Sequence, residues 1–525
     1  MHTLVSCPAK VLIGGGYLVL DPAYTGTVVA TSSRFYAYFD AKFTHEAYPN
    51  ALEGDSASME DQNTHSEKLL LVFRSPQFVD AEWTYLITRT TRQDTNHSFI
   101  AVRQMSDKKG LTARNPFVEV AILESFRLGF ALNGSLGFEV LHGTSHVTNG
   151  SLPMGTIVLL ADNDFYSQPR DQSNPLPFNA LGVPIAEVHK TGLGSSAAMV
   201  TSVCGALLLR IAPNLLVDQV SAQGKIGSGF DISAAVWGTH VYRRFSEDCL
   251  LASSASGVEG SAAELLALLD PKMNPLWTND DTAPRVKPFA LPPLTTLMLA
   301  DVDAGSHTPS MVGKVLSWRK ANTDEANSLW DNISILNERL GELCIKLNEM
   351  FNTDKLEYTA TVSQLSHHSN IGEIGGCKPV SEKDDTKALF LNLRATMQQT
   401  RKLMRCMGEA SDVPIEPPSQ TELLDKCDEL AGVVGSGVPG AGGYDAIWVL
   451  VYSPETASLI GAANVVKLWN DWSNVSVRAL SKDACVAGGT LIRPTGIRLE
   501  TMKEVKGLED VLSGKRRMST VAIPN

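Results

Sequence analysis

The sequence has no excess of basic residues, which limits the partners that the protein can bind. Its 525 residues include 45 lysines and arginines against 57 aspartates and glutamates, which gives a formal net charge of −12. No basic tract is longer than the short Lys515–Arg517. We expect no nucleic-acid partner, because a polyanion is bound by a dense basic surface.

The sequence also lacks long apolar runs and paired cysteines. No stretch reaches the roughly 18 continuous apolar residues of a membrane-spanning helix, and we expect neither a secretory signal nor a membrane span. The eight cysteines are scattered singly, and the one histidine pair, His367-His368, has no carboxylates at ligand spacing. These absences exclude a recognisable zinc or iron site and favour a reducing, cytoplasmic compartment.

Helix-type and strand-type patterns both recur along the chain, which predicts an α+β protein. Apolar runs at 11–13 and 17–20 flank Gly14-Gly15-Gly16, and we interpret them as two strands, or a strand and its return, joined at a glycine turn. Further strands are expected at 117–123, 138–141, 157–160, 295–300 and 446–452. Helices are expected at 197–211, 231–237, 327–350, 386–407 and 421–430.

Changes in composition suggest how the chain divides. A small-residue stretch at 251–274 and the pair Pro292-Pro293 mark a boundary, so we predict domains at residues 1–255 and 285–525. The polar stretch 41–68 is interpreted as an exposed insertion and 162–177 as a long loop, because such compositions bury little apolar surface.

The most informative segment is Lys190–Ala197, directly before the predicted buried helix at 197–211. Gly192 and Gly194 let backbone N–H groups approach an anion, and a helix N-terminus adds partial positive charge. Ser195 and Ser196 offer hydroxyls to phosphate and a divalent cation. Helix capping is the alternative explanation, but two glycines, two serines and a lysine exceed what capping needs. We predict a phosphate-binding loop, and we call Lys190–Ala197 the phosphate loop.

A second glycine-rich segment needs a different interpretation. Gly435, Gly437 and Gly440 match Gly-x-Gly-x-x-Gly, but the expected helix precedes them and the expected strand follows, the reverse of a dinucleotide-binding site. We interpret the stretch through Gly443 as a loop that approaches a substrate. A merely flexible turn is the alternative.

Several polar residues near predicted helix and strand ends are candidates for a substrate site. Asp231 follows a run of glycines and precedes a helix, where it contributes to a site or caps the helix. Arg243 and Arg244 can hold an anion through bidentate contacts, although a solvated strand edge explains them almost as well. Ser306 and Thr308 serve either substrate contact or helix capping.

Taken in order, these segments resemble the GHMP kinase superfamily, whose motifs are an N-terminal Pro-x-Lys segment, a Gly-Leu-Gly-Ser-Ser loop and a C-terminal glycine-rich loop. Five segments are similar to the fungal phosphomevalonate kinase family: Gly14-Gly-Gly-Tyr-Leu-Val-Leu-Asp-Pro, Lys190-Thr-Gly-Leu-Gly-Ser-Ser-Ala, Gly227-Ser-Gly-Phe-Asp-Ile, Tyr242-Arg-Arg-Phe and Pro439-Gly-Ala-Gly-Gly-Tyr-Asp-Ala. The resemblance spans Ser6 to Trp448. One departure is Ala9, which stands where the family has glycine and would be strained at a positive φ.

The resemblance implies a fold and a reaction. The fold would pair an N-terminal ribosomal-protein-S5-like α/β domain, with a left-handed β-α-β crossover, and a C-terminal ferredoxin-like domain. With ATP and Mg²⁺, the protein would convert 5-phosphomevalonate to 5-diphosphomevalonate, in the mevalonate route to isoprenoids and sterols. The acceptor phosphate is already ionised near neutral pH, because its second pKa is about 6, so no strong base is needed.

The same resemblance implies residue roles. The expected catalytic residues are Lys190, Asp231 and Lys10. The expected ATP-phosphate ligands are Gly192, Leu193, Gly194, Ser195, Ser196 and Ala197, and Ser196 would also bind Mg²⁺. The expected substrate-binding residues are Lys10, Ser228, Arg243, Arg244, Ser306, Thr308, Gly440, Ala441 and Gly442.

Three alternatives stay open at this point. A mevalonate kinase would act on a hydroxyl, and its need for proton removal would make Asp231 far more important. A diphosphomevalonate decarboxylase fits the quoted segments less well. A non-catalytic sensor of the same fold should lack one or more of the reactive groups, whereas Lys190, Ser196 and Asp231 are all present.

Overall fold

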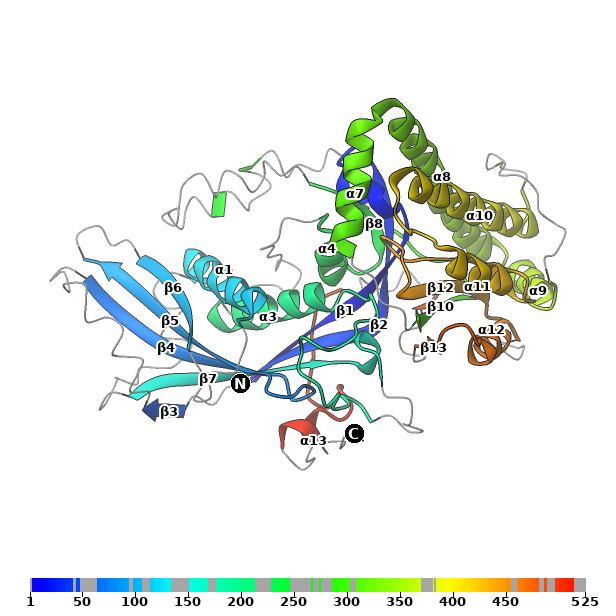
Figure 1. The fold of residues 1–525 in the computed structure, drawn as a ribbon. Coiled ribbons are helices and arrows are strands. Elements are labelled where there is room, and N and C mark those ends of the chain that lie inside the picture. Colours follow the sequence, from blue (N-terminus) through cyan, green and yellow to red (C-terminus); the bar gives the residue numbers. More distant parts are fainter. Residues whose placement is uncertain are drawn as a thin grey trace.

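The computed structural model describes the chain in segments that together build two sheets and their helices (Figure 1). These are residues 2–40, 44–47, 64–93, 98–105, 114–133, 151–168, 176–212, 228–245, 266–267, 273–274, 286–302, 308–369, 381, 384–454, 460–480, 486–488 and 496–513. The predicted strand at 138–141, most of the stretch 251–274 and Ser306 lie outside the described residues.

The larger sheet has ten strands among the described residues and runs in the order β15-β1-β2-β7-β4-β5-β6, with β3, β8 and β9 paired off this path. Of these pairings, only β4 with β7 is parallel. The strands are β1 Thr3–Gly14, β2 Thr25–Phe39, β3 Thr44–Ala47, β4 Thr64–Arg74, β5 Glu82–Arg92, β6 Ser98–Met105, β7 Ser151–Ala161, β8 His240–Arg243, β9 Val286–Pro288 and β15 Arg498–Leu499.

Three helices accompany this sheet: α1 (Pro116–Asn133), α3 (Ser195–Ile211) and α4 (Phe230–Trp237). Figure 1 shows α1 and α3 side by side over the strands. The predictions of a helix at 197–211, buried on most faces, and of one at 231–237 are confirmed. The predicted strand at 117–123 is wrong, because its buried positions recur every three to four residues and form one face of α1.

The second sheet runs β11-β12-β10-β13, with β14 paired to β10, and all of its pairings are antiparallel. Its strands are β10 Thr295–Val302, β11 Val433–Gly437, β12 Ala446–Tyr452, β13 Val477–Ala479 and β14 Val486–Ala487. The helices around it are α7 Thr308–Ala321, α8 Thr323–Thr353, α9 Lys355–Leu365, α10 Thr386–Ser411, α11 Pro418–Asp428 and α12 Ile460–Asp471.

The long helices of this half follow their sequence pattern closely. The apolar positions of α8 recur every three to four residues, and its buried set includes Trp330, Ile333, Leu340 and Leu347. The helices α8 and α10 pack against each other (Figure 1). No described helix combines the length and the apolarity needed to cross a membrane.

Two short segments depart from expectation. The stretch 17–20 is not a strand: Gly15 and Gly16 have positive φ angles of 92° and 47°, and the chain turns into a 3₁₀ helix, η1 (Gly16–Leu20). The insertion at 41–68 is not wholly outside the sheet, because β3 pairs with β7 and β4 begins at Thr64. Polar strands of this kind are held by backbone pairing with a neighbour, which composition does not reveal.

The segment 496–513 returns to the larger sheet, where β15 pairs with β1 and the short helix α13 (Leu508–Leu512) follows. Arg34 is buried on β2 and joins this segment to the sheet: its Nε donates to Ser6 Oγ at 2.6 Å and its Nη2 to the carbonyl of Gly496. Ser6 Oγ in turn donates to Glu500 Oε1 at 2.6 Å. Residues far beyond the predicted boundary therefore complete the first sheet, and the division at 1–255 and 285–525 stays a prediction.

Candidate active site

The phosphate loop leads from the sheet into α3 through two glycines with left-handed backbone. Gly192 has a φ of 76° and Gly194 a φ of 81°, a region that favours glycine. Gly194 is the N-cap of α3, and no side chain caps the helix there. The capping explanation for the serines is therefore wrong, and the first N–H groups of a 17-residue helix face the loop with the positive end of its dipole.

The segment just after β7 is hydrogen-bonded to the phosphate loop. The hydroxyl of Thr191 donates to the carbonyl of Asp164 at 2.6 Å, and the Asp164 carboxylate accepts from Ser33 Oγ at 2.7 Å. Asp164 lies in the short 3₁₀ helix η3 (Asn163–Phe165). The predicted long loop at 162–177 is thus partly a structured support, and residues 169–175 lie outside the described chain.

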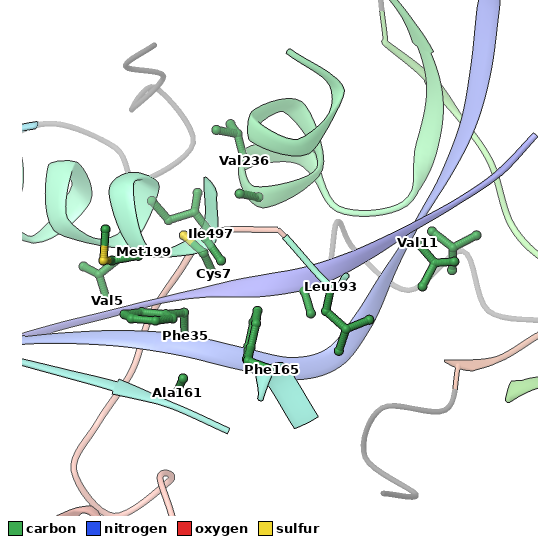
Figure 2. Close-up of a cluster of buried hydrophobic side chains, with 14 of the residues drawn as sticks. Val5, Cys7, Val11, Phe35, Ala161, Phe165, Leu193, Met199, Val236 and Ile497 are labelled. Atoms are coloured by element: carbon green, nitrogen blue, oxygen red, sulfur yellow. The ribbon is translucent and has the colours of Figure 1, made fainter. Parts of the chain in front are cut away.

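Some side chains of the phosphate loop are buried in the core, and others are accessible to solvent. Leu193 is buried in one cluster with Val11, Phe165 and Val236 (Figure 2). Ser195 is buried and hydrogen-bonds the hydroxyl of Tyr166, whose pKa is raised by burial. Ser196 is only partly buried, so its hydroxyl is the accessible one.

Lys10 reaches the phosphate loop from β1. Its backbone N–H donates to the carbonyl of Leu193 at 3.0 Å, and its Nζ donates to the carbonyl of Gly192 at 3.0 Å. The ammonium also lies 5.2 Å from the centre of the Phe230 ring at the start of α4. Burial lowers the pKa of Lys10, while the nearby Asp231 carboxylate acts in the opposite direction. The structure therefore brings Lys10, the loop and Asp231 together, as predicted.

The alanine that replaces the usual glycine does not disturb this placement. Ala9 is fully buried inside β1 and is not among the residues with a positive φ. A register irregularity between Pro8 and Lys10 lies at this point of the β1–β2 pairing. Ala9 is therefore accommodated without the strain that a left-handed conformation would cause.

Asp231 is not a helix cap. The N-cap of α4 is Gly229, with a φ of 79°, and Asp231 is the second residue of the helix. One of its oxygens accepts from the backbone N–H of Ile232 at 3.0 Å. The capping alternative is wrong, and the carboxylate is left beside Lys10.

The structure places Lys190 differently from Lys10. Its backbone pairs with Tyr166, while its side chain is exposed. No described contact joins its ammonium to the other predicted catalytic groups, so its role in catalysis stays a prediction.

Some of the predicted acceptor residues around β8 already form hydrogen bonds within the protein. Among the described residues, the Nε of Arg243 is buried with no hydrogen-bond partner, a feature that several other arginines share and that does not by itself mark an anion site. Arg244 donates to the carbonyl of Leu20 at 2.6 Å, and the Ser228 carbonyl accepts from the Tyr242 hydroxyl at 2.6 Å. Thr308 begins α7, and its side chain is not among those described.

The glycine-rich stretch at 435–443 is only in part a loop. Gly435 and Gly437 lie in β11, and an added Cβ on Gly437 would meet the Trp448 ring at 2.6 Å. The loop proper follows and contacts the first half of the molecule: Gly440 N–H donates to the Leu12 carbonyl at 3.0 Å. The Tyr17 hydroxyl donates to the Ala441 carbonyl at 2.9 Å. These contacts place the loop at the end of the strand that carries Lys10.

A small pocket of about 40 Å³ lies beside this contact. Its walls come from both halves of the molecule and include Gly14–Gly16, Gly440, Met404 and Arg401. The glycine loop thus contacts the half of the molecule that carries Lys10. Its approach to a substrate stays a prediction.

The donor set around the phosphate loop suits one kind of metal. Among the described residues, no three His, Cys, Asp or Glu side chains are grouped so that they could hold a metal ion. Ser196 and Asp231 offer a hydroxyl and a carboxylate. This fits Mg²⁺, which commonly keeps several waters and binds through one or two protein oxygens together with substrate phosphates.

A buried histidine fixes the helix that carries Asp231. His240 Nε2 lies 2.8 Å from Ser233 Oγ on α4, and its Nδ1 lies 2.8 Å from the Gly238 carbonyl. Burial lowers the pKa of His240 to about 4. The imidazole is therefore neutral in the folded protein at neutral pH, and it joins α4 to β8.

We expect His240 to make the protein sensitive to acid. Because its folded pKa lies below the usual value near 6.5, its stabilising effect is complete above pH 6.5 and is lost as the pH falls toward 4. The loss reaches about 3 kcal/mol. Urea unfolding at pH 7 and pH 4.5 measures it. His240→Gln should remove much of this dependence, whereas the same change at the exposed His367 should not; equal pH dependence in both variants would contradict the assignment.

The comparisons with known proteins agree with this geometry. The chain is 36% identical to the phosphomevalonate kinase of Aspergillus fumigatus over 479 residues, which cover 86% of this chain and 87% of that protein. It is 33% identical to the peroxisomal phosphomevalonate kinase of Arabidopsis thaliana, over 91% of this chain and 94% of that one. No family model matches.

A solved structure has a similar fold. The Lin0012 protein of Listeria innocua superimposes with a TM-score of 0.55 at 14% identity, over 95% of this chain and 99% of that one.

The sequence did not reveal the residues that support the site. Asp164, Tyr166 and Ser33 lie far from the phosphate loop in sequence and carry no motif, so no spacing signal was available. The sequence did contain a signal for Phe230, because this residue lies in the Gly-Phe-Asp segment that includes Asp231.

Proposed function

This chain belongs to the phosphomevalonate kinase family of GHMP kinases, and we propose that the site around Lys10, the phosphate loop and Asp231 transfers a phosphoryl group from ATP to 5-phosphomevalonate. The two sheets and their helices confirm the predicted α+β class, and the family membership confirms the predicted kinase function. The observation that carries the site assignment is the position of Lys10, whose ammonium touches the loop and lies beside Asp231.

The reaction requires two polyanions to meet. An ionised oxygen of the acceptor phosphate attacks the γ-phosphorus of ATP, a new P–O bond forms, and the bond to the β-γ bridging oxygen breaks to release ADP. The N–H groups at the start of α3, from Ser195, Ser196 and Ala197, are placed to hold ATP phosphates, with Gly192, Leu193 and Gly194 shaping the approach. Lys10 and Lys190 would neutralise the charge that develops on the transferred group.

A divalent cation fits this arrangement. Ser196, whose hydroxyl is accessible, and Asp231 would hold Mg²⁺ together with the ATP phosphates. When bound, the ion would lower the charge of the phosphates.

The acceptor side is proposed from the residues that the family resemblance indicates. Arg243 is a candidate for an acceptor anion, because a guanidinium can hold a phosphate or a carboxylate through bidentate contacts. The other proposed contacts are Lys10, Ser228, Arg244, Ser306, Thr308, Gly440, Ala441 and Gly442. For Arg244 the support is weaker, since one of its nitrogens already holds the Leu20 carbonyl.

A cytoplasmic location is proposed from the composition of the chain. The plant relative is named peroxisomal, which makes the peroxisome the alternative compartment. Fluorescent tagging at either end, followed by colocalisation with a peroxisomal marker, distinguishes the two.

The direct test is ADP release by the purified protein with ATP and Mg²⁺. Phosphomevalonate, mevalonate and no acceptor are compared in parallel. Turnover with phosphomevalonate alone supports the proposal. Turnover with mevalonate instead would overturn the acceptor, and no turnover with either would revive the non-catalytic sensor.

We expect Asp231→Asn to lower kcat by about tenfold or less, because an ionised phosphate needs no general base. The variant should also move the alkaline limb of the kcat profile to lower pH, since the Asp231 carboxylate raises the pKa of Lys10. Steady-state kinetics across pH 7–10 measure both effects. A loss of about a thousandfold or more that saturating Mg²⁺ does not relieve would indicate a hydroxyl acceptor and proton abstraction by Asp231.

A further inference from the structure

A short segment, Tyr166–Gln168, lies directly beside the approach to the phosphate loop. The backbone of Tyr166 pairs with Lys190, and the N–H of Ser167 donates to the His189 carbonyl at 3.0 Å. His189 and Lys190 immediately precede Thr191 and the first loop glycine. Any shift of the segment is therefore passed through backbone pairing to the residues that position the loop.

The other side of the same segment is held by the second sheet. Ser167 Oγ donates to Asp301 Oδ2 at 2.7 Å, and Arg478 Nη1 donates to the carbonyl of Gln168. Asp301 on β10 and Arg478 on β13 stand directly opposite each other in the sheet. Asp301 is 6% exposed, which shields its hydrogen bond from water. We call Ser167, Gln168, Asp301 and Arg478 the interdomain clasp.

The clasp is also close in sequence to the predicted acceptor contacts. β10 ends at Val302, one residue after Asp301, and the chain then leads toward Ser306 and Thr308. In sequence, β10 is thus followed by a segment proposed for the acceptor, of which residues 303–307 lie outside the described residues. The segment Tyr166–Gln168, which β10 and β13 hold, pairs with the residues at the start of the phosphate loop.

We propose that the interdomain clasp couples the two substrate sites, so that binding of an acceptor that contacts both halves of the molecule tightens nucleotide binding at the phosphate loop. The inference rests on the proposed function. Ser167 and Asp301 act as positioning residues, because they hold the backbone before the loop and lie outside the set of proposed substrate contacts. Linkage then requires the nucleotide to tighten acceptor binding by the same factor.

The test measures the dissociation constant of AMP-PNP, a non-hydrolysable ATP analogue, with and without saturating acceptor. The ratio of the two constants is the coupling factor, and wild type should give about fivefold or more. Ser167→Ala and Asp301→Asn should bring it close to one. Ser167→Thr, which keeps the hydroxyl, should restore it.

Thr361→Ala is the matched control, because Thr361 makes an equivalent hydroxyl–carboxylate hydrogen bond to Glu357 on the exposed surface of α9. Its coupling factor should equal that of wild type. The double variant Ser167→Ala/Asp301→Asn should be no worse than either single change, since both remove the same contact.

Two results would overturn the inference: a wild-type coupling factor of one, or an unchanged factor in variants whose melting temperature matches that of the control. The acceptor used is whichever one supports ADP release. A failure of the proposed function therefore appears in the turnover assay, and a failure of the clasp appears in the binding ratio.

Discussion

Lys10→Met is expected to lower kcat by about 10²–10³-fold while the protein stays folded. The substitution keeps most of the apolar length of the side chain but removes the ammonium that contacts the Gly192 carbonyl and lies beside Asp231. A preorganised charge that is aimed at the transferred phosphoryl group and partly shielded from water is worth several kcal/mol in the transition state. Steady-state kinetics with saturating ATP and acceptor measure the loss.

The matched control is Lys426→Met on α11, where the lysine is exposed and its ammonium pairs with Glu429 at 2.9 Å. It should keep wild-type kcat. A loss of less than tenfold in Lys10→Met, with an unchanged melting temperature, would move the main catalytic charge to Lys190. The alternative is then tested directly by Lys190→Met.

Gly194→Ala is expected to lower kcat/KM for ATP by about a hundredfold. Two costs add at this position: a φ of 81° strains any residue with a Cβ, and the new methyl would stand 2.8 Å from Lys10 Cε. The strain alone amounts to about 1–2 kcal/mol. The contact pushes the catalytic lysine away from the loop, so kcat should fall together with ATP affinity.

Gly192→Ala separates these two costs. Gly192 has a similar φ of 76°, but an added Cβ would meet nothing within 4 Å. Its kcat/KM for ATP should fall by about 5- to 30-fold, which is the share expected of about 1–2 kcal/mol of backbone strain. Equal losses in the two variants would show that displacement of Lys10 contributes nothing.

The sequence predicted the long elements well because their signal is repeated many times. In α8 and α10, apolar residues recur over seven turns or more, and chance rarely reproduces such a pattern. The segments 17–20 and 117–123 are short apolar runs, which fit a strand and a helix equally. Only the tertiary environment decided them: η1 packs against the helices of the second domain, and α1 against α3.

The sequence predicted the site residues that lie in motifs, but not the residues that hold these motifs in place. Lys10, the phosphate loop and Asp231 stand in recognisable motifs. The resemblance of these motifs to a known family therefore assigned them to one site from the sequence alone. The residues that hold the loop in place, Asp164 and Tyr166, act through contacts between distant parts of the chain. A hydrogen bond to a backbone carbonyl sets no demand on residue type at the acceptor, so it leaves no pattern to find.

The return of residues 496–513 to the first sheet has a consequence for synthesis on the ribosome. The strands and helices around the phosphate loop are encoded first, yet β1 is paired by β15, and the buried Arg34 gains its contacts with Gly496 and Glu500 only after these residues have been added. At about 5–20 residues per second, the interval between β8 and β15 is on the order of tens of seconds. The larger sheet of the nascent chain is therefore incomplete until residues 496–513 have been made. During that interval the unpaired edge of β1 is exposed, and a chaperone can protect it.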